Sequence, residues 1–163
     1  MIFVGIDVGL KGGVVAINEH QLIQYKHVMP VIKINNKNEY NVKLIVEIFK
    51  EIIKLDTMEN IFVILEKEHV RPISGKRASF LLGYGYGGMQ FLLESFGVSY
   101  EIVSPQAWMK ELGITSKDTK GSIVYCQRKW PSINWCGTDR SRKPHDGLTD
   151  AACMALYGYR KNR

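Results

Sequence analysis

The chain has 163 residues, of which 45% are hydrophobic and 23% are charged. This composition is typical of a globular protein and argues against a long disordered segment. The length suits one α/β domain with its own core, so we expect a single domain over residues 1–163. No apolar run reaches the ~20 residues that cross a bilayer, and an acidic residue interrupts the apolar N-terminus where a signal peptide would continue. We therefore expect a cytoplasmic protein without membrane association.

The net charge of +6 comes from the C-terminal third of the chain. Residues 1–107 contain eleven Lys/Arg and eleven Asp/Glu, whereas residues 108–163 contain eleven and five. A concentrated positive field favours a polyanionic partner, most often nucleic acid, and a solvated basic surface is the alternative. The three cysteines are odd in number and lack CxxC spacing, so the pattern indicates neither a disulfide framework nor a zinc site.

The N-terminal half predicts four strands and a helix. Short β-branched runs at 2–7, 12–17 and 22–29, separated by turn residues, predict three antiparallel strands. Residues 42–55 carry apolar side chains at helical spacing and predict an amphipathic helix. Residues 61–66, IFVILE, form an almost continuous apolar run that ends in an acid. This run predicts a strand buried on both faces, lying beside the first strand.

The C-terminal half alternates helices with one more strand. After a polar loop at 67–77, a helix is predicted up to Phe96; its glycines at 83, 85, 87 and 88 favour close helix approach or a bend. Next come a strand at 98–104 and a helix from Pro105 to Lys110. A further helix, capped by Thr115 or Ser116, runs to Arg128. A basic loop at 131–144 then leads to a last helix from His145 to Tyr159. The pattern predicts an α/β fold with a mixed five-stranded sheet, three strands antiparallel and two parallel, flanked by helices.

Several carboxylates stand where a purely structural role is costly. Asp7 ends the first strand inside an apolar run, and burying a carboxylate there is unfavourable unless it is paired or bound to metal. Glu66 ends the buried strand in the same way, so neighbouring strands would bring both acids to one rim of the sheet. Asp146 and Asp150 lie four residues apart at the start of the last helix and share one helical face. They can add one or two ligands.

Converging carboxylates repel each other unless cations lie between them. Oxygen ligands without organised Cys or His favour Mg²⁺, with Mn²⁺ as a substitute, over zinc. Two such ions, about 3.5 to 4 Å apart, activate water and stabilise the leaving oxygen in phosphodiester cleavage. Each acid also has a structural alternative: Asp7 can cap a turn, Glu66 can pair with Lys67 or Arg71, and Asp146 can favour a helix N-terminus.

Five motifs resemble the RuvC-type Holliday junction resolvases, in particular a short bacteriophage-encoded member, over nearly the full length. They are GIDVGLKGGVVA, ILEKEHV, ASFLLGYGYGGMQFLLES, SPQAWMK and HDGLTDAACMAL. The resemblance implies an RNase H-like fold, a homodimer, and symmetric Mg²⁺-dependent nicking of branched DNA that leaves 5′-phosphate ends. The substrates would be four-way junctions, with forks and flaps as further candidates, in the cytoplasm of a host bacterium.

The resemblance also assigns site residues. Asp7, Glu66 and Asp150 match the family's metal-binding carboxylates. The family places a further acid or a His three residues before the final Asp, where this chain has Gly147. We therefore assign Asp146 as the fourth catalytic and metal-binding acid, with His145 as an additional candidate ligand.

The DNA-contacting residues are assigned in the same way. His69 stands where family members present an aromatic side chain that stacks on DNA. This departure argues against sequence-specific cleavage and against a strict preference for four-way junctions. Lys110 and Lys120 resemble family lysines near the scissile phosphate, where a cation stabilises developing charge, and Lys120 is assigned as catalytic. The remaining basic residues are assigned to backbone contacts, which position DNA without reading its sequence: Arg71, Lys76, Arg77, Lys117, Arg140, Arg142 and Lys143.

Two other classes of protein share part of this pattern. Asp7-Val8-Gly9 followed by Gly12-Gly13 also resembles the first phosphate motif of sugar-kinase and actin-like ATPases, but those enzymes need two domains and a second phosphate loop. A non-catalytic branched-DNA-binding protein would explain the basic charge but not Glu66 at a buried strand end. The nuclease hypothesis accounts for both the charge and the acids.

Overall fold

A mixed five-stranded sheet forms the centre of the computed structural model, which describes residues 1–68, 75–115, 121–138 and 140–163. The strands lie in the order β3-β2-β1-β6-β7. Strands β1, β2 and β3 pair antiparallel, and β6 and β7 continue the sheet parallel to β1. Their bounds are β1 Ile2–Asp7, β2 Gly13–Asn18, β3 Ile23–Val28, β6 Ile61–Glu66 and β7 Ser99–Val103. The predicted five-stranded arrangement and the central place of residues 61–66 are confirmed.

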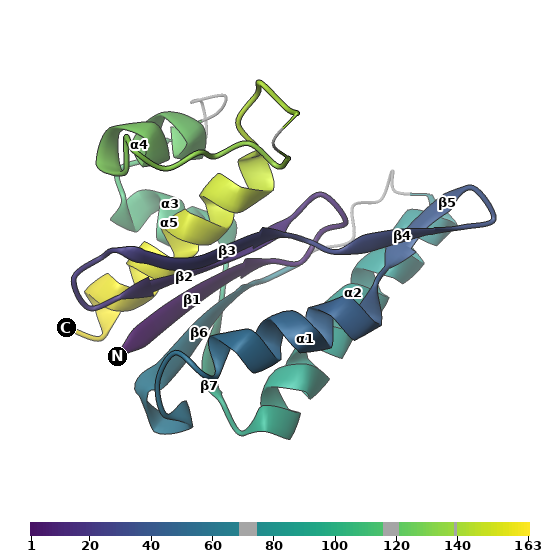
Figure 1. Ribbon diagram of the computed structural model, residues 1–163, viewed down its shortest axis with the longest axis horizontal. Helices are drawn as coiled ribbons and strands as arrows, with labels where there is room; N and C mark the ends of the chain where they lie inside the picture. The colour runs from purple at the N-terminus through teal and green to yellow at the C-terminus, as the bar shows by residue number, and fades with distance from the viewer. Residues whose placement is uncertain (69–74, 116–120, 139) are drawn as a thin grey trace.

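Helices cover both faces of this sheet (Figure 1). Their bounds are α1 Val42–Ile52, the short 3₁₀ helix η1 Met58–Asn60, α2 Lys76–Phe96, α3 Pro105–Glu111, α4 Gly121–Lys129 and α5 Asp146–Lys161. Successive side chains of a strand point to opposite faces, so the two faces build separate cores. Phe3 packs with the side of α3, α4 and α5, whereas Val4 packs with the side of α1 and α2. Within the described residues, no helix combines the length and the hydrophobicity that crossing a membrane requires.

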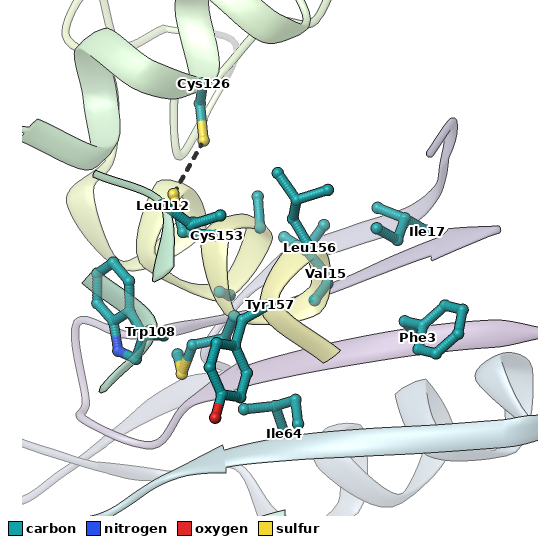
Figure 2. Close-up of a cluster of buried hydrophobic side chains, with 14 of the residues drawn as sticks. Phe3, Val15, Ile17, Ile64, Trp108, Leu112, Cys126, Cys153, Leu156 and Tyr157 are labelled. Atoms are coloured by element: carbon teal, nitrogen blue, oxygen red, sulfur yellow. Dashed lines mark hydrogen bonds between the residues drawn. The ribbon is translucent and has the colours of Figure 1, made fainter. Parts of the chain in front are cut away.

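Helix α5 lies almost directly on β1. A Cβ atom at Gly5 would lie 1.9 Å from the backbone oxygen of Ala151, so only glycine permits this approach. Residues 147–158 of α5 are buried except Asp150, in agreement with the apolar sequence AACMAL. Figure 2 shows Cys153 of α5 facing Cys126 of α4 within this core, with 3.8 Å between their sulfur atoms. Both are free thiols, as is the partly buried Cys136.

A second, two-stranded sheet was not predicted from the sequence. Within the described part of the chain, strands β4 Val31–Ile34 and β5 Lys37–Tyr40 pair only with each other. Asn35 and Asn36 connect them with φ angles of 49° and 61°, the left-handed pair of a two-residue type I′ turn, in which asparagine is tolerated. Residues 31–38 are exposed. Without a buried face, this hairpin has little hydrophobic signal in its sequence.

Several predicted boundaries and one packing prediction differ from the structure. Helix α1 ends at Ile52 instead of 55, and α2 begins at Lys76, inside the predicted loop. Ser116, a predicted cap, lies outside the described residues together with 117–120, so the predicted start of the helix that contains α4 stays a prediction. A Cβ at Gly85 would lie 2.5 Å from the Tyr40 ring, so this glycine accommodates an aromatic side chain instead of a second helix. Around the other three α2 glycines, no described atom beyond the adjacent residues and the helix's own nearby backbone lies within 4 Å of the Cβ position. Close packing of α2 through them within the chain is therefore wrong.

Candidate metal centre and nucleic-acid surface

Three carboxylates meet where β1 and β6 end. The parallel pairing of Ile6 with Leu65 places the ends of the two strands side by side, so Asp7 and Glu66 emerge at the same edge. Glu68 follows two residues later. The Lys67 amide donates to the Val103 carbonyl at 2.8 Å, which continues the extended pairing and keeps Glu66 and Glu68 on one face. One carboxylate oxygen from each of the three acids lies within 4.8 Å of the others.

Sequence reasoning missed Glu68 because it treated residues 67–77 as an undifferentiated polar loop. The signal that could have found it is the two-residue spacing from Glu66, which places both side chains on the same side of an extended chain. The structure brings Glu68 to the two strand-end acids that the sequence singled out. A cluster of this composition is capable of binding a metal ion.

Neighbouring groups orient the carboxylates of Asp7 and Glu66. The Gly9 amide donates to Asp7 Oδ1 at 3.1 Å, so the predicted turn cap exists alongside the cluster. The indole Nε1 of Trp108 donates to Glu66 Oε1 at 2.8 Å. Trp108 lies in α3 and is buried. Helix α3 thereby fixes the acid at the end of β6.

Burial and mutual repulsion disfavour the charged forms of these acids. Burial is the main cause that raises the pKa of Asp7 well above its ordinary value, and the charge of Glu66 raises it further. Burial raises the pKa of Glu66 to about 7, with repulsion from Asp150 and Glu68 adding to this and the Trp108 hydrogen bond opposing it. A divalent cation would offset both effects. The donor set, all hard carboxylate oxygens, fits such an ion.

Asp150 approaches the cluster from helix α5. Burial raises its pKa, a hydrogen bond from the Ser122 hydroxyl lowers it, and the charge of Asp146 raises it. Its own charge raises the pKa of both Asp7 and Glu66, so Asp150 lies near them, although it is outside the group within 4.8 Å. Asp146 is exposed at the first position of α5, where its Oδ1 accepts from the Gly147 amide at 3.2 Å.

His145 serves as the N-cap of α5. Its Nδ1 accepts from the Leu148 amide at 3.3 Å. In this arrangement His145 positions the helix that carries Asp150.

At Gly147, three residues before Asp150, the backbone leaves no room for a side chain. A Cβ at Gly147 would lie 2.3 Å from the Lys11 carbonyl oxygen and 2.6 Å from the Gly12 Cα. Helix α5 thus begins in direct contact with the turn between β1 and β2. The same contact holds Asp150 close to Asp7.

The basic residues assigned to DNA contacts are exposed wherever the structure describes them. Lys76 and Arg77 begin α2, Lys110 lies in the last turn of α3, and the segment between α4 and α5 carries three more: Arg140, Arg142 and Lys143. Arg77 also donates to the Asn38 carbonyl at 3.0 Å and to Glu39 at 2.7 Å. The other assigned residues lie outside the described part of the chain: His69, Arg71, Lys117 and Lys120.

Comparison with known proteins identifies similar folds. No protein-family model matches the chain, and no curated protein matches it by sequence. The structure of Thermus thermophilus RuvC in complex with a Holliday junction substrate is 16% identical and superposes with a TM-score of 0.67, covering 99% of this chain and 95% of that chain. A second Thermus thermophilus RuvC structure is also 16% identical, with a TM-score of 0.58 and coverage of 99% and 96%. The predicted RNase H-like fold is thereby confirmed.

Proposed function

We propose that this chain is a structure-selective DNA endonuclease that nicks Holliday junctions and other branched DNA, forks and flaps included. The observation that carries this proposal is the cluster of Asp7, Glu66 and Glu68 at the paired ends of β1 and β6. The similar fold of a RuvC bound to a Holliday junction substrate supports the choice of DNA as substrate. The cellular role would be recombination, repair or the processing of a bacteriophage genome.

In this proposal the acids bind two Mg²⁺ ions, for which Mn²⁺ can substitute. The residues that would hold them are Asp7, Glu66, Glu68 and Asp150, with Asp146 at the margin of the site. When bound, such ions generate a nucleophilic water at neutral pH and stabilise the leaving oxygen of the phosphodiester. The raised pKa values of Asp7, Glu66 and Asp150 support this assignment, because carboxylates that repel each other gain from a shared cation.

The rest of the chain contributes positioning and positive charge. The Gly9 amide and the Trp108 indole hold one oxygen each of Asp7 and Glu66, which fixes the ligands before the substrate arrives. Lys110 is exposed two residues after Trp108 in α3. We propose that it faces the substrate phosphates, together with Lys120. The hydroxyl of Ser122 orients Asp150.

The acidic cluster favours an enzyme over a module that only binds DNA. Buried carboxylates beside a phosphate backbone weaken binding unless a cation separates the charges. A module that only binds DNA gains nothing from three acids within 4.8 Å of one another. The cluster has a purpose when a metal ion and a reacting phosphate meet there.

We further propose that residues 1–163 act as a single domain, in the bacterial cytoplasm, and as a homodimer formed through α2. One stripe of α2 presents exposed aromatic residues at helical spacing, namely Phe80, Tyr84 and Phe91. Gly87 and Gly88 lie along the same stripe with open space above them. Exposed apolar surface of this kind suits a second copy of the helix. A dimer would present two acidic clusters to two of the four strands of a four-way junction.

The proposal is tested with a panel of synthetic DNAs of matched sequence: a four-way junction, a fork, a flap and a linear duplex. Each is incubated with the protein in Mg²⁺, in Mn²⁺ and in EDTA, and the nick positions are mapped. We expect nicks near the branch point in the branched DNAs, in both metals, and none in EDTA. Equal cleavage of the linear duplex, or cleavage in EDTA, would contradict the proposal.

A further inference from the structure

The β4–β5 hairpin and the N-terminal part of α2 border a groove of about 750 Å³ beside the acidic cluster. We call it the hairpin groove; its lining includes Gly9, Lys33, Lys37, Tyr40, Arg77 and Leu81. Gly9 is also the residue whose amide donates to Asp7. One end of the hairpin groove therefore adjoins the site where cleavage is proposed.

The hairpin groove is positively charged. Lys33 and Lys37 contribute two cations, and the lining asparagines, Asn36 and Asn38, add amide donors. Arg77 also lines the groove, with its charge paired to Glu39, and none of the described lining residues is acidic. The backbone phosphates of DNA are bound by this combination of cations and amides. Tyr40 and leucine side chains line the same groove, and apolar surface of this kind suits sugars and bases.

Specific contacts hold the hairpin in place. An isolated two-stranded hairpin is marginally stable in water, so contacts with the rest of the chain have to fix its position. The Tyr40 hydroxyl donates to the Val8 carbonyl at 3.0 Å, next to Asp7. From α2, Arg77 donates to the Asn38 carbonyl and to Glu39. The lysines of the hairpin are thus carried on a framework attached both to the acidic site and to α2.

The main sheet does not need this hairpin. Among the described residues, β4 and β5 pair only with each other. The hairpin that they form extends beyond the edge of the five-stranded sheet (Figure 1). Residues 31–38 are exposed and contribute nothing to the two cores. A segment that is anchored at several points and yet adds no buried residue before Tyr40 is better explained by binding than by stability.

We infer that the hairpin groove binds the DNA strand beside the scissile phosphate, with Lys33 and Lys37, which both line the groove, contacting backbone phosphates. This inference rests on the proposed nuclease function, because that function supplies the DNA. The hairpin would determine how far the contact with DNA extends from the acidic site. It adds a binding surface to the basic residues that the sequence singled out.

The test replaces Lys33→Gln and Lys37→Gln together. The matched control is Lys50→Gln with Lys54→Gln, two exposed lysines in or just after α1 whose surface ion pairs with Glu47 and Glu51 contribute little to stability. Affinity for a four-way junction is measured in Ca²⁺ between 50 and 200 mM salt. Affinity falls as salt rises, and each lost phosphate contact makes the plot of log affinity against log salt less steep by roughly 0.7 to 0.9.

For two contacts, the plot for the hairpin variant should be less steep by roughly 1.4 to 1.8, and the plot for the control should keep the wild-type slope. Over this fourfold rise in salt, the wild-type protein should therefore lose roughly 7 to 12 times more affinity than the hairpin variant does. Equal slopes in the wild-type protein and the hairpin variant would overturn the inference, even if the wild-type protein nicks junctions. A changed slope in a protein that never nicks DNA would overturn the nuclease proposal and leave the groove as a DNA-binding surface.

Discussion

Asp7 combines a structural role with a proposed chemical one. Its Oδ1 accepts the Gly9 amide and so stabilises the turn after β1. A carboxylate has two oxygens and several lone pairs, so capping a turn and binding a cation are compatible. The two interpretations of Asp7 that the sequence left open do not exclude each other.

Glu68 offers a direct test of the cluster's composition. Replacing Glu68→Gln keeps the size of the side chain and removes one of three negative charges that lie within 4.8 Å. We expect Mg²⁺ affinity to fall at least about tenfold, the smallest loss typical of even an outer-shell partner, and nicking to fall with it. Isothermal titration and nicking rates measure the two effects. The control is Glu59→Gln in η1, an exposed acid before the other end of β6; equal behaviour of the two variants would remove Glu68 from the site.

Gly147 gives a prediction about stability. Its Cβ would lie within 2.6 Å of two backbone atoms of the β1–β2 turn, and neither can move like a side chain. Gly147→Ala should therefore lower the free energy of unfolding by about 1 to 3 kcal/mol. Gly83→Ala, in the open middle of α2, should raise it by up to about 1 kcal/mol because alanine favours helix. Denaturant titration measures both, and a stabilising Gly147→Ala change would contradict the described contact.

The sequence identified some site residues and not others for physical reasons. Asp7 and Glu66 each interrupt an apolar run, so their cost was visible without a structure. Glu68 lies among polar residues, where one more acid carries no signal. The place of Gly147 depends on a contact with a turn more than 130 residues away, which no local pattern reports.

At the scale of elements, hydrophobic periodicity predicted those strands and helices that are buried on one or both faces. The strands of the main sheet and all five α-helices have such faces, so their existence followed from the sequence and only their ends differed. The β4–β5 hairpin has no buried face before Tyr40. Its turn uses two asparagines in place of the Asn-Gly pair that usually identifies a hairpin. This element therefore appeared only in the structure.

Helix α2 carries the prediction about assembly. Phe91 is 79% exposed on the stripe that we propose to face a second copy. Phe91→Asp would bury a charge in that interface and should convert a dimer into a monomer at micromolar concentration. The control is Val124→Asp in α4, which is 44% exposed on another helix. Sedimentation velocity distinguishes the outcomes: a wild-type monomer would contradict the dimer, and a dimeric Phe91→Asp variant would contradict the assigned interface.

At the scale of the whole molecule, the positive charge and the acids are separate in sequence. The basic excess belongs to the last third of the chain, whereas Asp7, Glu66 and Glu68 come from the first half. The contact of α5 with β1 brings the two regions together. Net charge could predict a polyanionic partner, but this folding arrangement decides where the partner meets the acids.

The basic segment before α5 should contribute affinity and not shape selectivity. Replacing Arg140, Arg142 and Lys143 with glutamine should weaken binding of junctions, forks and flaps by similar factors, because phosphate contacts carry no sequence information. The salt slope should fall by up to about 2.7, at roughly 0.9 for each contact. Fluorescence anisotropy over a salt series measures this, with glutamine at Lys43, Lys50 and Lys54 as the matched control. Loss of binding to one structure alone would identify the segment as a reader of shape.

The central claim is that the carboxylates at the ends of β1 and β6 perform the cleavage, and Asp7→Asn tests it most directly. The measurement is single-turnover nicking of a four-way junction in Mg²⁺, with affinity for the same junction determined in parallel and Asp56→Asn as the control. We predict that Asp7→Asn nicks at the background rate and binds the junction as well as the wild-type protein or better, because one negative charge facing DNA is gone. Nicking by Asp7→Asn at the wild-type rate would contradict the account.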